Sequence, residues 1–438
     1  MTHPKIMPKP KDCCTVIGGS TYYPLMIGGM GVDISTSAMV LEAARLGCIA
    51  HLSDAMVPAV CDKNFGTAFT KHKAENHHRL QKEEFIQDRI PQFDLHEYRL
   101  AQTRYIADTV EKKKGTGGIF VNCMEKLQVG SPLELLEIRL KSSLDAGADG
   151  ISLSAGLHTS SMRLMSDHPR FREAKIGIVV SSWRALKLFL RSANRVNRLP
   201  DYIVVEGPLA GGHLGFGDDW ANYTLKEIVI DILNNLEQEG LRIPVIPAGG
   251  IFDADDVSLF LEIGAAAVQV ATRFTVTKES GLPDTAKQSF FEAGEKDVFV
   301  APVSPTGYPI RLLHSSPCVN SNIAPQCIPL GYAMNAKGQC QYIDAYKETG
   351  ISETGKKLPV VGKVCLCHHI GRYDVWTCGS NVIRLKETVT KNAEGIYQQP
   401  TTEEVIQEYL GERVPLRARS ASAQANPVPA AGAGAAEH

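Results

Sequence analysis

The residues best suited to chemistry lie in a glycine-rich segment that ends in a histidine. Residues 206–213 read EGPLAGGH and directly follow a short apolar run. Glycine lets the backbone approach another group closely or adopt positive φ. An imidazole titrates near neutral pH, so it can remove a proton from carbon or donate one. An isolated Gly-Gly-His would be an ordinary turn with a solvated histidine, but its place after a predicted strand favours His213 as a catalytic base.

Two further segments of small residues are suited to holding a phosphate. Residues 247–251 read PAGGI and residues 269–274 read QVATRF. Each segment includes the C-terminal end of a predicted strand and the residues that follow it. Small residues expose backbone N–H groups, which bind anions at the ends of barrel strands. Thr272 would add a hydroxyl group and Arg273 a positive charge. Tight barrel closure also prefers small residues, so the predicted phosphate site depends on the two segments together.

These segments belong to a regular alternation of apolar runs and amphipathic stretches. β-branched residues dominate the runs, and Gly, Pro, Asn or Asp bound them, which is typical of strands buried on both faces. The eight runs cover residues 24–27, 48–52, 118–122, 150–154, 176–180, 202–206, 243–248 and 267–271. Apolar stripes at spacings of three and four predict helices at 35–46, 95–110, 132–146, 183–194, 225–239 and 254–263. Eight units over about 270 residues predict an α/β (β/α)8 TIM barrel, in preference to an open doubly wound sheet.

Several segments depart from the barrel rhythm. The predicted barrel covers 24–302, after an N-terminal leader at 1–23. An insertion after the second strand, 60–114, begins with a charged part that we expect to be a solvated loop or a lid. Residues 303–417 form a C-terminal extension expected to pack on the barrel. The Ala-, Pro-, Ser- and Gly-rich segment 418–438 is predicted to be a disordered tail.

Composition limits the possible partners and location. The 438 residues include 46 Lys+Arg and 48 Asp+Glu, a net charge of −2, which lacks the basic excess of a nucleic-acid binder. No apolar run reaches about 18 residues, and the N-terminus lacks the apolar core of a secretory signal. Eleven scattered cysteines suit reduced thiols. We therefore expect a cytoplasmic enzyme acting on a small molecule, without nucleic acid or membrane partners, and a homo-oligomer stays open.

Two groups of residues receive structural interpretations. Cys318 to Cys378 include a Cys-x-Cys pair followed by His368 and His369, which raises the question of zinc or an iron–sulfur cluster. That spacing matches standard metal motifs poorly, so we predict no metal site and buried thiols instead. His51 lies on the second predicted strand, where a hydrogen-bonded core histidine is the simpler interpretation.

The order of these motifs resembles that of the nitronate monooxygenase family, formerly called 2-nitropropane dioxygenases. That family has an FMN-binding TIM barrel with a Pro-to-Met-Gly segment at the first strand, Gly-x-Asn at the third, Ala-Gly-Gly-His, Ala-Gly-Gly-Ile and a final Gln-x-Gly-Thr-Arg-Phe. The corresponding residues here are 24–31, 121–122, 210–213, 248–251 and 269–274. The resemblance covers residues 24–302, and the Ala-Gly-Gly-His element makes it specific.

The resemblance implies FMN as the cofactor and assigns residues to it. His213 would be the catalytic base facing the flavin, and Asn122 would reach the flavin or its ribityl chain. The other cofactor-binding residues would be Gly28, Gly29 and Met30 along the isoalloxazine, Glu206, Gly207, Gly211 and Gly212 beside it, and Gly249, Gly250, Gln269, Val270, Ala271 and Thr272 around the phosphate.

Two departures from the family pattern leave alternatives open. Glu206 stands where the monooxygenases often carry Gln, and Ala271 replaces a Gly. The sequence Glu-Gly-x-x-Ala-Gly-Gly-His is also similar to that of FMN-dependent enoyl-acyl-carrier-protein reductases. We therefore predict a nitronate monooxygenase, which uses O2 to convert nitronates or nitroalkanes to a carbonyl compound and nitrite. The alternatives are an NAD(P)H-dependent enoyl-thioester reductase and an NAD(P)H:quinone reductase.

Overall fold

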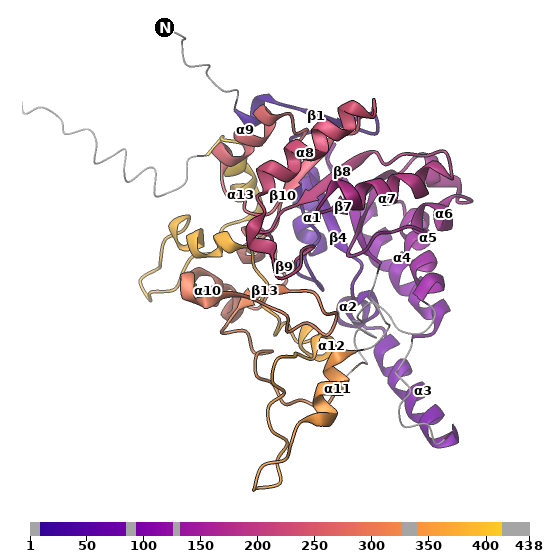
Figure 1. Ribbon diagram of the computed structural model, residues 1–438, viewed down its shortest axis with the longest axis vertical. Coiled ribbons are helices and arrows are strands. Elements are labelled where there is room, and N and C mark those ends of the chain that lie inside the picture. Colours follow the sequence, from indigo (N-terminus) through magenta and orange to yellow (C-terminus); the bar gives the residue numbers. More distant parts are fainter. Residues whose placement is uncertain (1–8, 85–92, 126–131, 326, 328–339, 414–438) are drawn as a thin grey trace, which may run out of the picture.

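A closed barrel of eight parallel strands organises the molecule (Figure 1). The computed structural model describes residues 9–84, 93–125, 132–325, 327 and 340–413. The barrel strands, in chain order, are β3 (Leu25–Ile27), β4 (Ile49–Ser53), β5 (Gly118–Met124), β6 (Gly150–Ser154), β7 (Lys175–Val180), β8 (Tyr202–Glu206), β10 (Val245–Ala248) and β11 (Val268–Val270). Each strand pairs with the next, and β11 closes the barrel on β3. The predicted α/β TIM barrel and its eight strands are confirmed.

The barrel interior is a packed core with a short hairpin at its N-terminal end. Side chains from six strands, among them Phe120 and Tyr202, fill this interior cluster. The antiparallel strands β1 (Thr15–Ile17) and β2 (Ser20–Tyr22) precede the barrel and place Ile17 and Tyr22 in the same cluster. Residues 15–22 of the predicted leader are therefore an ordered hairpin that caps the end of the barrel opposite the predicted site.

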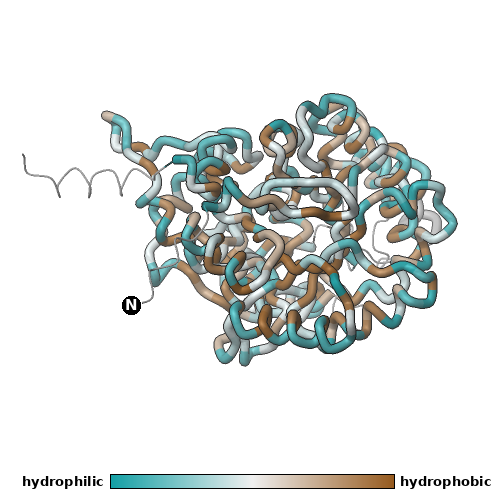
Figure 2. Tube along the Cα trace, turned by 90° about the horizontal axis from the view of Figure 1, so that it is seen from above, coloured by the Kyte–Doolittle hydropathy of each residue, from teal (hydrophilic) through white to brown (hydrophobic). Residues whose placement is uncertain are grey.

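Helices surround the barrel and also occur in the chain between β11 and α13, and polar side chains cap several of their N-termini. They are α1 (Ser37–Arg45), α2 (Val57–Phe65), α3 (Phe69–Glu84), α4 (Leu95–Glu111), α5 (Pro132–Asp145), α6 (Ser161–Met165), α7 (Trp183–Asn194), α8 (Leu225–Gln238), α9 (Ala254–Ile263), α10 (Asp284–Glu292), α11 (Gln341–Glu348), α12 (Leu366–Ile370) and α13 (Thr402–Tyr409). Thr36, Ser182 and Thr224 each accept a backbone N–H in the first turn of the helix that follows, as N-caps do. Figure 2 shows hydrophobic stretches inside the molecule and hydrophilic ones along its outline.

The eighth helix of the ring comes from far along the chain. Helix α13 packs against α1 and α9, the position that a helix directly after β11 would otherwise take. Tyr409 of α13 stacks on Phe274, which follows β11. The barrel therefore uses residues beyond the predicted boundary at 302, and residues 271–401 form an excursion between its last strand and last helix.

The predicted insertion is largely helical. The charged segment that we expected to be a loop or lid forms α3, and it follows α2 through a tight turn. The carboxylate of Asp62 organises this turn, because it accepts hydrogen bonds from the N–H groups of Phe69 and Thr70, both at 2.8 Å. This side chain lies seven residues before the helix, so a search for an adjacent N-cap misses it.

The excursion after β11 builds a second, smaller sheet over the barrel mouth. Strands β12 (Val298–Ala301) and β13 (Ile310–Leu313) are antiparallel, and β13 pairs with the short strand β9 (Gly212–His213). The 3-10 helix η6 (Ser380–Glu387) follows later in the excursion. The predicted tail, 418–438, lies outside the described residues. Among the helices that the structure describes, none is both long and apolar enough to cross a membrane.

Candidate active site

The glycine-rich loop after β8 is held in place by the strand β13. Ile310 and Arg311 pair with His213 and Gly212, and the N–H of Leu214 donates to the carbonyl of Pro309 at 2.9 Å. The Arg311 side chain is buried, and its Nη1 donates to the carbonyl oxygens of Pro208, at 2.7 Å, and Ala210, at 2.5 Å. The loop that carries the predicted base is thus fixed by residues about 100 positions later.

The imidazole of His213 is held by a hydroxyl network and remains neutral. Its Nε2 lies 2.6 Å from the Oγ of Ser304, which in turn lies 2.8 Å from the Oγ1 of Thr306. Surrounding protein desolvates the ring and lowers the pKa of His213 from its ordinary 6.5 to about 4. His213 as a whole is an exposed residue. The lowered pKa of His213 favours the neutral imidazole at pH 7.

Glu206 is an uncompensated carboxyl group at the C-terminal end of β8. Burial raises the pKa of Glu206 from 4.5 to about 7, and among the described residues no neighbouring cation opposes this effect. Its backbone lies in register with Ala248 of β10, directly before the second glycine segment. His213 and Glu206 therefore come from the same loop region and have pKa values displaced in opposite directions.

The segment after β10 has the geometry of an anion-binding turn. Gly249 and Gly250 have φ values of +96° and +83°, which are left-handed conformations that glycine adopts without strain. Within the described residues, the N–H groups of these two glycines and of Thr272 donate to no protein acceptor. Consecutive free N–H groups in such a turn form an anion-binding nest. A Cβ on Gly249 would lie 2.9 Å from the N atom of Ala210, so this turn also packs on the His213 loop.

The loop after β3 contacts the end of β5 and the side chain of Gln269. A Cβ on Gly29 would lie 2.3 Å from the Cβ of Asn122, and one on Gly28 would lie 3.2 Å from the side-chain amide of Gln269. The N–H of Gly28 donates to Val270, and the N–H of Met30, whose side chain is buried, donates to Ser35 at 2.9 Å. These predicted cofactor residues are therefore brought together at the same end of the barrel.

Two of the predicted glycines contact protein at the position of their missing side chain. A Cβ on Gly207 would lie 2.8 Å from the Cβ of Leu225 in α8, and one on Gly211 would lie 2.5 Å from the backbone of Cys378. Gly212, with φ of +78°, has no neighbour within 4 Å of that position. The packing of helix α8 and of the excursion thus accounts for glycine at 207 and 211.

Some residues of the final segment, 269–274, belong to the candidate site, and others pack against the outer helices. Gln269 is in register with Ala248 and Met26, and Ala271 and Thr272 are half-buried. Arg273, however, is buried and paired with Glu408 of α13. The expectation that Arg273 lends its charge to a phosphate is wrong, because the helix that completes the ring takes up that charge.

Sequence reasoning missed a contribution from the excursion to the same site. Residues 379–381, at the start of η6, contact both the segment after β10 and the segment after β11. The N–H of Gly379 donates to Thr272 Oγ1 at 2.9 Å, and Asn381 Nδ2 donates to the Gly250 carbonyl at 2.6 Å. The buried Ser380 Oγ has no hydrogen-bond partner within the described residues. No motif marks this segment, which lies over 100 residues from Thr272.

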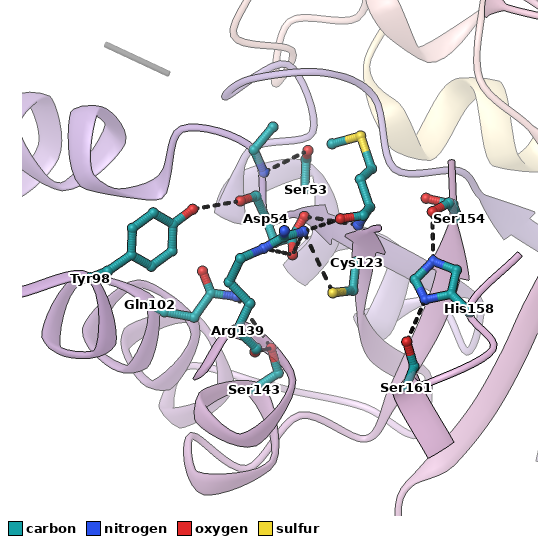
Figure 3. Close-up of polar contacts among 12 residues, drawn as sticks. Ser53, Asp54, Tyr98, Gln102, Cys123, Arg139, Ser143, Ser154, His158 and Ser161 are labelled. Carbon is teal, nitrogen blue, oxygen red and sulfur yellow. Dashed lines mark hydrogen bonds and ion pairs between the residues drawn. The ribbon is translucent and has the colours of Figure 1, made fainter. Parts of the chain in front are cut away.

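A buried polar cluster stabilises the strand ends beside Asn122 (Figure 3). Asp54, directly after β4, accepts hydrogen bonds from Arg139 Nε at 2.7 Å and Nη2 at 2.5 Å, and from the Met124 N–H at 3.3 Å. Arg139 also donates to the Met124 carbonyl. His158 is fully buried and bridges Ser161 and the Ser154 carbonyl, at 2.7 Å each. These side chains are mutually satisfied, so we assign them to positioning rather than to chemistry.

The remaining candidates have structural explanations. His51 is fully buried, with Nδ1 2.7 Å from the Ile27 carbonyl and Nε2 2.6 Å from Ser152 Oγ, which confirms the core interpretation. Across the described residues, no group of three or more His, Cys, Asp or Glu side chains is arranged to hold a metal ion.

Acid–base groups and free backbone N–H groups at the C-terminal ends of the strands are the arrangement typical of active sites in (β/α)8 barrels. The profile of the family described as nitronate monooxygenase matches residues 98–358, more than half of the chain. The chain belongs to the nitronate monooxygenase family.

Individual relatives carry different names. The chain is 36% identical over 115 residues to a Mycobacterium tuberculosis protein named (3aS,4S,5R,7aS)-5-hydroxy-7a-methyl-1-oxo-octahydro-1H-indene-4-carboxyl-CoA dehydrogenase, covering 26% of this chain and 30% of that protein. It is 32% identical over 111 residues to a probable nitronate monooxygenase of Staphylococcus saprophyticus, covering 25% and 31%. Each alignment therefore spans less than a third of the relative. The enoyl reductase domain of MlnA from Bacillus amyloliquefaciens shares the fold, with a TM-score of 0.56, 12% identity, and coverage of 93% of this chain and 97% of that chain.

Proposed function

We propose that this protein is an FMN-dependent nitronate monooxygenase that acts on nitroalkanes and nitronates. The observation that carries the proposal is the His213 imidazole at the end of the barrel, which Ser304 holds by Nε2 at 2.6 Å. A base that removes the α-proton of a neutral nitroalkane must be unprotonated and fixed in orientation. The lowered pKa of His213 and its contact with Ser304 support both requirements.

The residues at this end fit FMN. The free N–H groups at Gly249, Gly250 and Thr272 suit a phosphate, and the buried Ser380 hydroxyl offers a further donor. The glycines at 28 and 29 let the β3 loop pack directly against Gln269 and Asn122, two of the residues assigned to the cofactor. Bound FMN would supply the redox chemistry that no side chain of the barrel provides.

The hydrogen bonds accommodate the tautomer that the proposed base requires. Ser304 Oγ accepts the N–H of Thr306 at 3.2 Å and, when it donates its own proton to Thr306 Oγ1, accepts the Nε2–H of His213. Nδ1 is then unprotonated and available to accept the substrate's α-proton. Ser304 is therefore a positioning residue, and His213 Nδ1 is the atom that takes the proton.

A specific observation favours one second candidate, an enoyl-thioester reductase. Glu206 holds a proton up to about pH 7, so it could donate one to a substrate carbon. The CoA-ester substrate in the name of the Mycobacterium tuberculosis relative also supports a thioester. In this case the protein would use NAD(P)H as its reductant, as would a quinone reductase.

One anaerobic experiment separates these functions. The FMN-loaded protein is mixed in turn with NADH, NADPH, a nitronate and a neutral nitroalkane, and flavin absorbance is followed; O2 is then admitted and nitrite measured. We expect nitrite from both nitro substrates and unchanged absorbance with the pyridine nucleotides. Bleaching by NADH or NADPH with reduction of an enoyl thioester would contradict the proposal. His213→Asn should abolish turnover of the neutral nitroalkane while sparing FMN binding.

A further inference from the structure

Two cysteines far apart in the sequence lie in direct contact in the excursion. The thiol groups of Cys327 and Cys367 are hydrogen-bonded to each other. Cys327 is 9% exposed and Cys367, on α12, is 4% exposed, and both belong to the main apolar cluster. Cys340 and Cys365 lie close enough to influence the same sulfur atoms.

A buried lysine lies beside this pair. Lys73 of α3 is only 1% exposed; its Nζ donates to the Cys327 carbonyl at 3.0 Å and lies 4.0 Å from the centre of the Phe93 ring. Burial lowers the pKa of Lys73 to about 7, and the Cys367 and Cys327 thiols raise it in opposition. Within the described residues no carboxylate pairs with this amine. Thiolate is therefore the anion best placed to balance a Lys73 ammonium group.

The two thiols are chemically unequal. The hydrogen bond from Cys367, together with the nearby Lys73, lowers the pKa of Cys327 despite its burial. The same hydrogen bond, together with burial, raises the pKa of Cys367. A thiolate stabilised by a neighbouring thiol and an ammonium group, with that second thiol in contact, is the arrangement found in redox-active dithiols.

We propose that Cys327 and Cys367 form a redox-active dithiol that peroxide oxidises reversibly to a disulfide. The Cys327 thiolate attacks a peroxide oxygen, giving Cys327 sulfenic acid and, from H2O2 and one proton, water. The Cys367 sulfur then displaces the hydroxyl group from Cys327, forming the disulfide and a second water. Two thiols and one H2O2 thus become one disulfide and two waters.

The position of the pair connects it with the active site. Val364, three residues before Cys367, donates its N–H to the Val303 carbonyl at 2.9 Å, and Lys363 Nζ lies 3.3 Å from the Ser304 carbonyl. Oxidation would link α12 covalently to residue 327. The segment directly before α12 contacts residues 303 and 304, so this link would constrain the part of the chain that contacts Ser304.

Mass spectrometry of the full-length protein tests the pairing directly. The protein is reduced, freed of reductant, treated with H2O2, denatured, alkylated and digested. We expect a Cys327–Cys367 cross-linked peptide that dithiothreitol converts to two alkylated peptides. Complete alkylation of both cysteines after peroxide treatment, or a disulfide between other cysteines, would overturn the proposal. So would stoichiometric zinc or iron that blocks alkylation of these thiols in the purified protein.

Variants test the order of the two steps. In Cys367→Ser the sulfenic acid has no resolving thiol, so dimedone should label Cys327; in Cys327→Ser, residue 367 should stay unlabelled. Lys73→Met should slow the peroxide reaction about tenfold, because loss of the ammonium group raises the pKa of Cys327 and so reduces the thiolate fraction. Cys318→Ser, which changes another buried thiol of the excursion, is the control and should retain the cross-link. Equal labelling at both positions would refute the assigned order.

Discussion

The Nε2 atom of His213 lies 2.6 Å from the hydroxyl oxygen of Ser304, a residue 91 positions later in the chain. The barrel loop supplies the imidazole, and the excursion after β11 supplies the hydroxyl group that holds it. The segment outside the βα rhythm therefore positions the proposed catalytic base.

Ser304→Ala should slow proton removal without weakening substrate binding. The ring loses the acceptor that holds its Nε2–H, so both tautomers and other orientations become accessible. We expect kcat for a neutral nitroalkane to fall about 10- to 100-fold, as for other partners that orient a functional histidine, with KM nearly unchanged. Turnover of a preformed nitronate, which needs no proton removal, should be largely spared. Ser289→Ala on α10 is the control, and equal losses on both substrates would contradict this prediction.

The carboxyl group of Glu206 should make the stability of the FMN-free protein depend on pH. Its pKa is raised from 4.5 to about 7, so the folded state holds a proton that the unfolded chain releases. Its contribution is therefore fully present below pH 4.5 and is lost as the pH rises through about 7. The decrease in unfolding free energy should stay below about 3 kcal/mol, the equivalent of the full shift. Urea titrations at several pH values should show a flatter profile for Glu206→Gln; an unchanged profile would contradict the assignment.

The local sequence predicted the barrel well because the strand and the helix of each βα unit are determined largely by residues within that unit. Apolar runs bounded by turn residues identified all eight strands, and apolar spacing placed helices such as 183–194 and 254–263 at their observed bounds. The glycine segments were recognisable because positive φ and close approach restrict the residue type. Ser304, Arg311 and Asn381 were not predictable, because their contacts span 91 to 131 residues and involve common residue types in irregular segments. For the same reason, the sequence did not indicate that α13, far along the chain, provides the eighth helix of the ring.

Asn381→Ala should weaken FMN binding. Asn381 Nδ2 donates to the Gly250 carbonyl at 2.6 Å and so holds the turn whose N–H groups face the proposed phosphate. Loss of one such hydrogen bond corresponds to about 1 kcal/mol, or about a fivefold increase in Kd. Fluorescence titration of the FMN-free protein measures this change. Asn322→Ala removes a comparable contact to the Lys357 carbonyl on an exposed loop and should leave Kd unchanged; similar losses in both variants would argue against a specific effect at the turn.

Arg139→Met should destabilise the fold far more than the loss of a surface ion pair. Asp54 has no exposed side-chain surface, and both Arg139 nitrogens that reach it are buried, so the variant leaves a carboxylate in the interior without its cation. Such a loss is worth about 3–5 kcal/mol of unfolding free energy. Arg45→Met, which breaks the exposed pair with Glu42, is the control and should change stability by less than about 1 kcal/mol.

Adding Asp54→Asn to Arg139→Met should recover part of the loss, because a neutral amide is less costly to bury than an unpaired charge. Urea unfolding of the four proteins measures these differences. Equal effects of Arg139→Met and Arg45→Met would show that the buried pair does not hold β4 and β5 together beside Asn122.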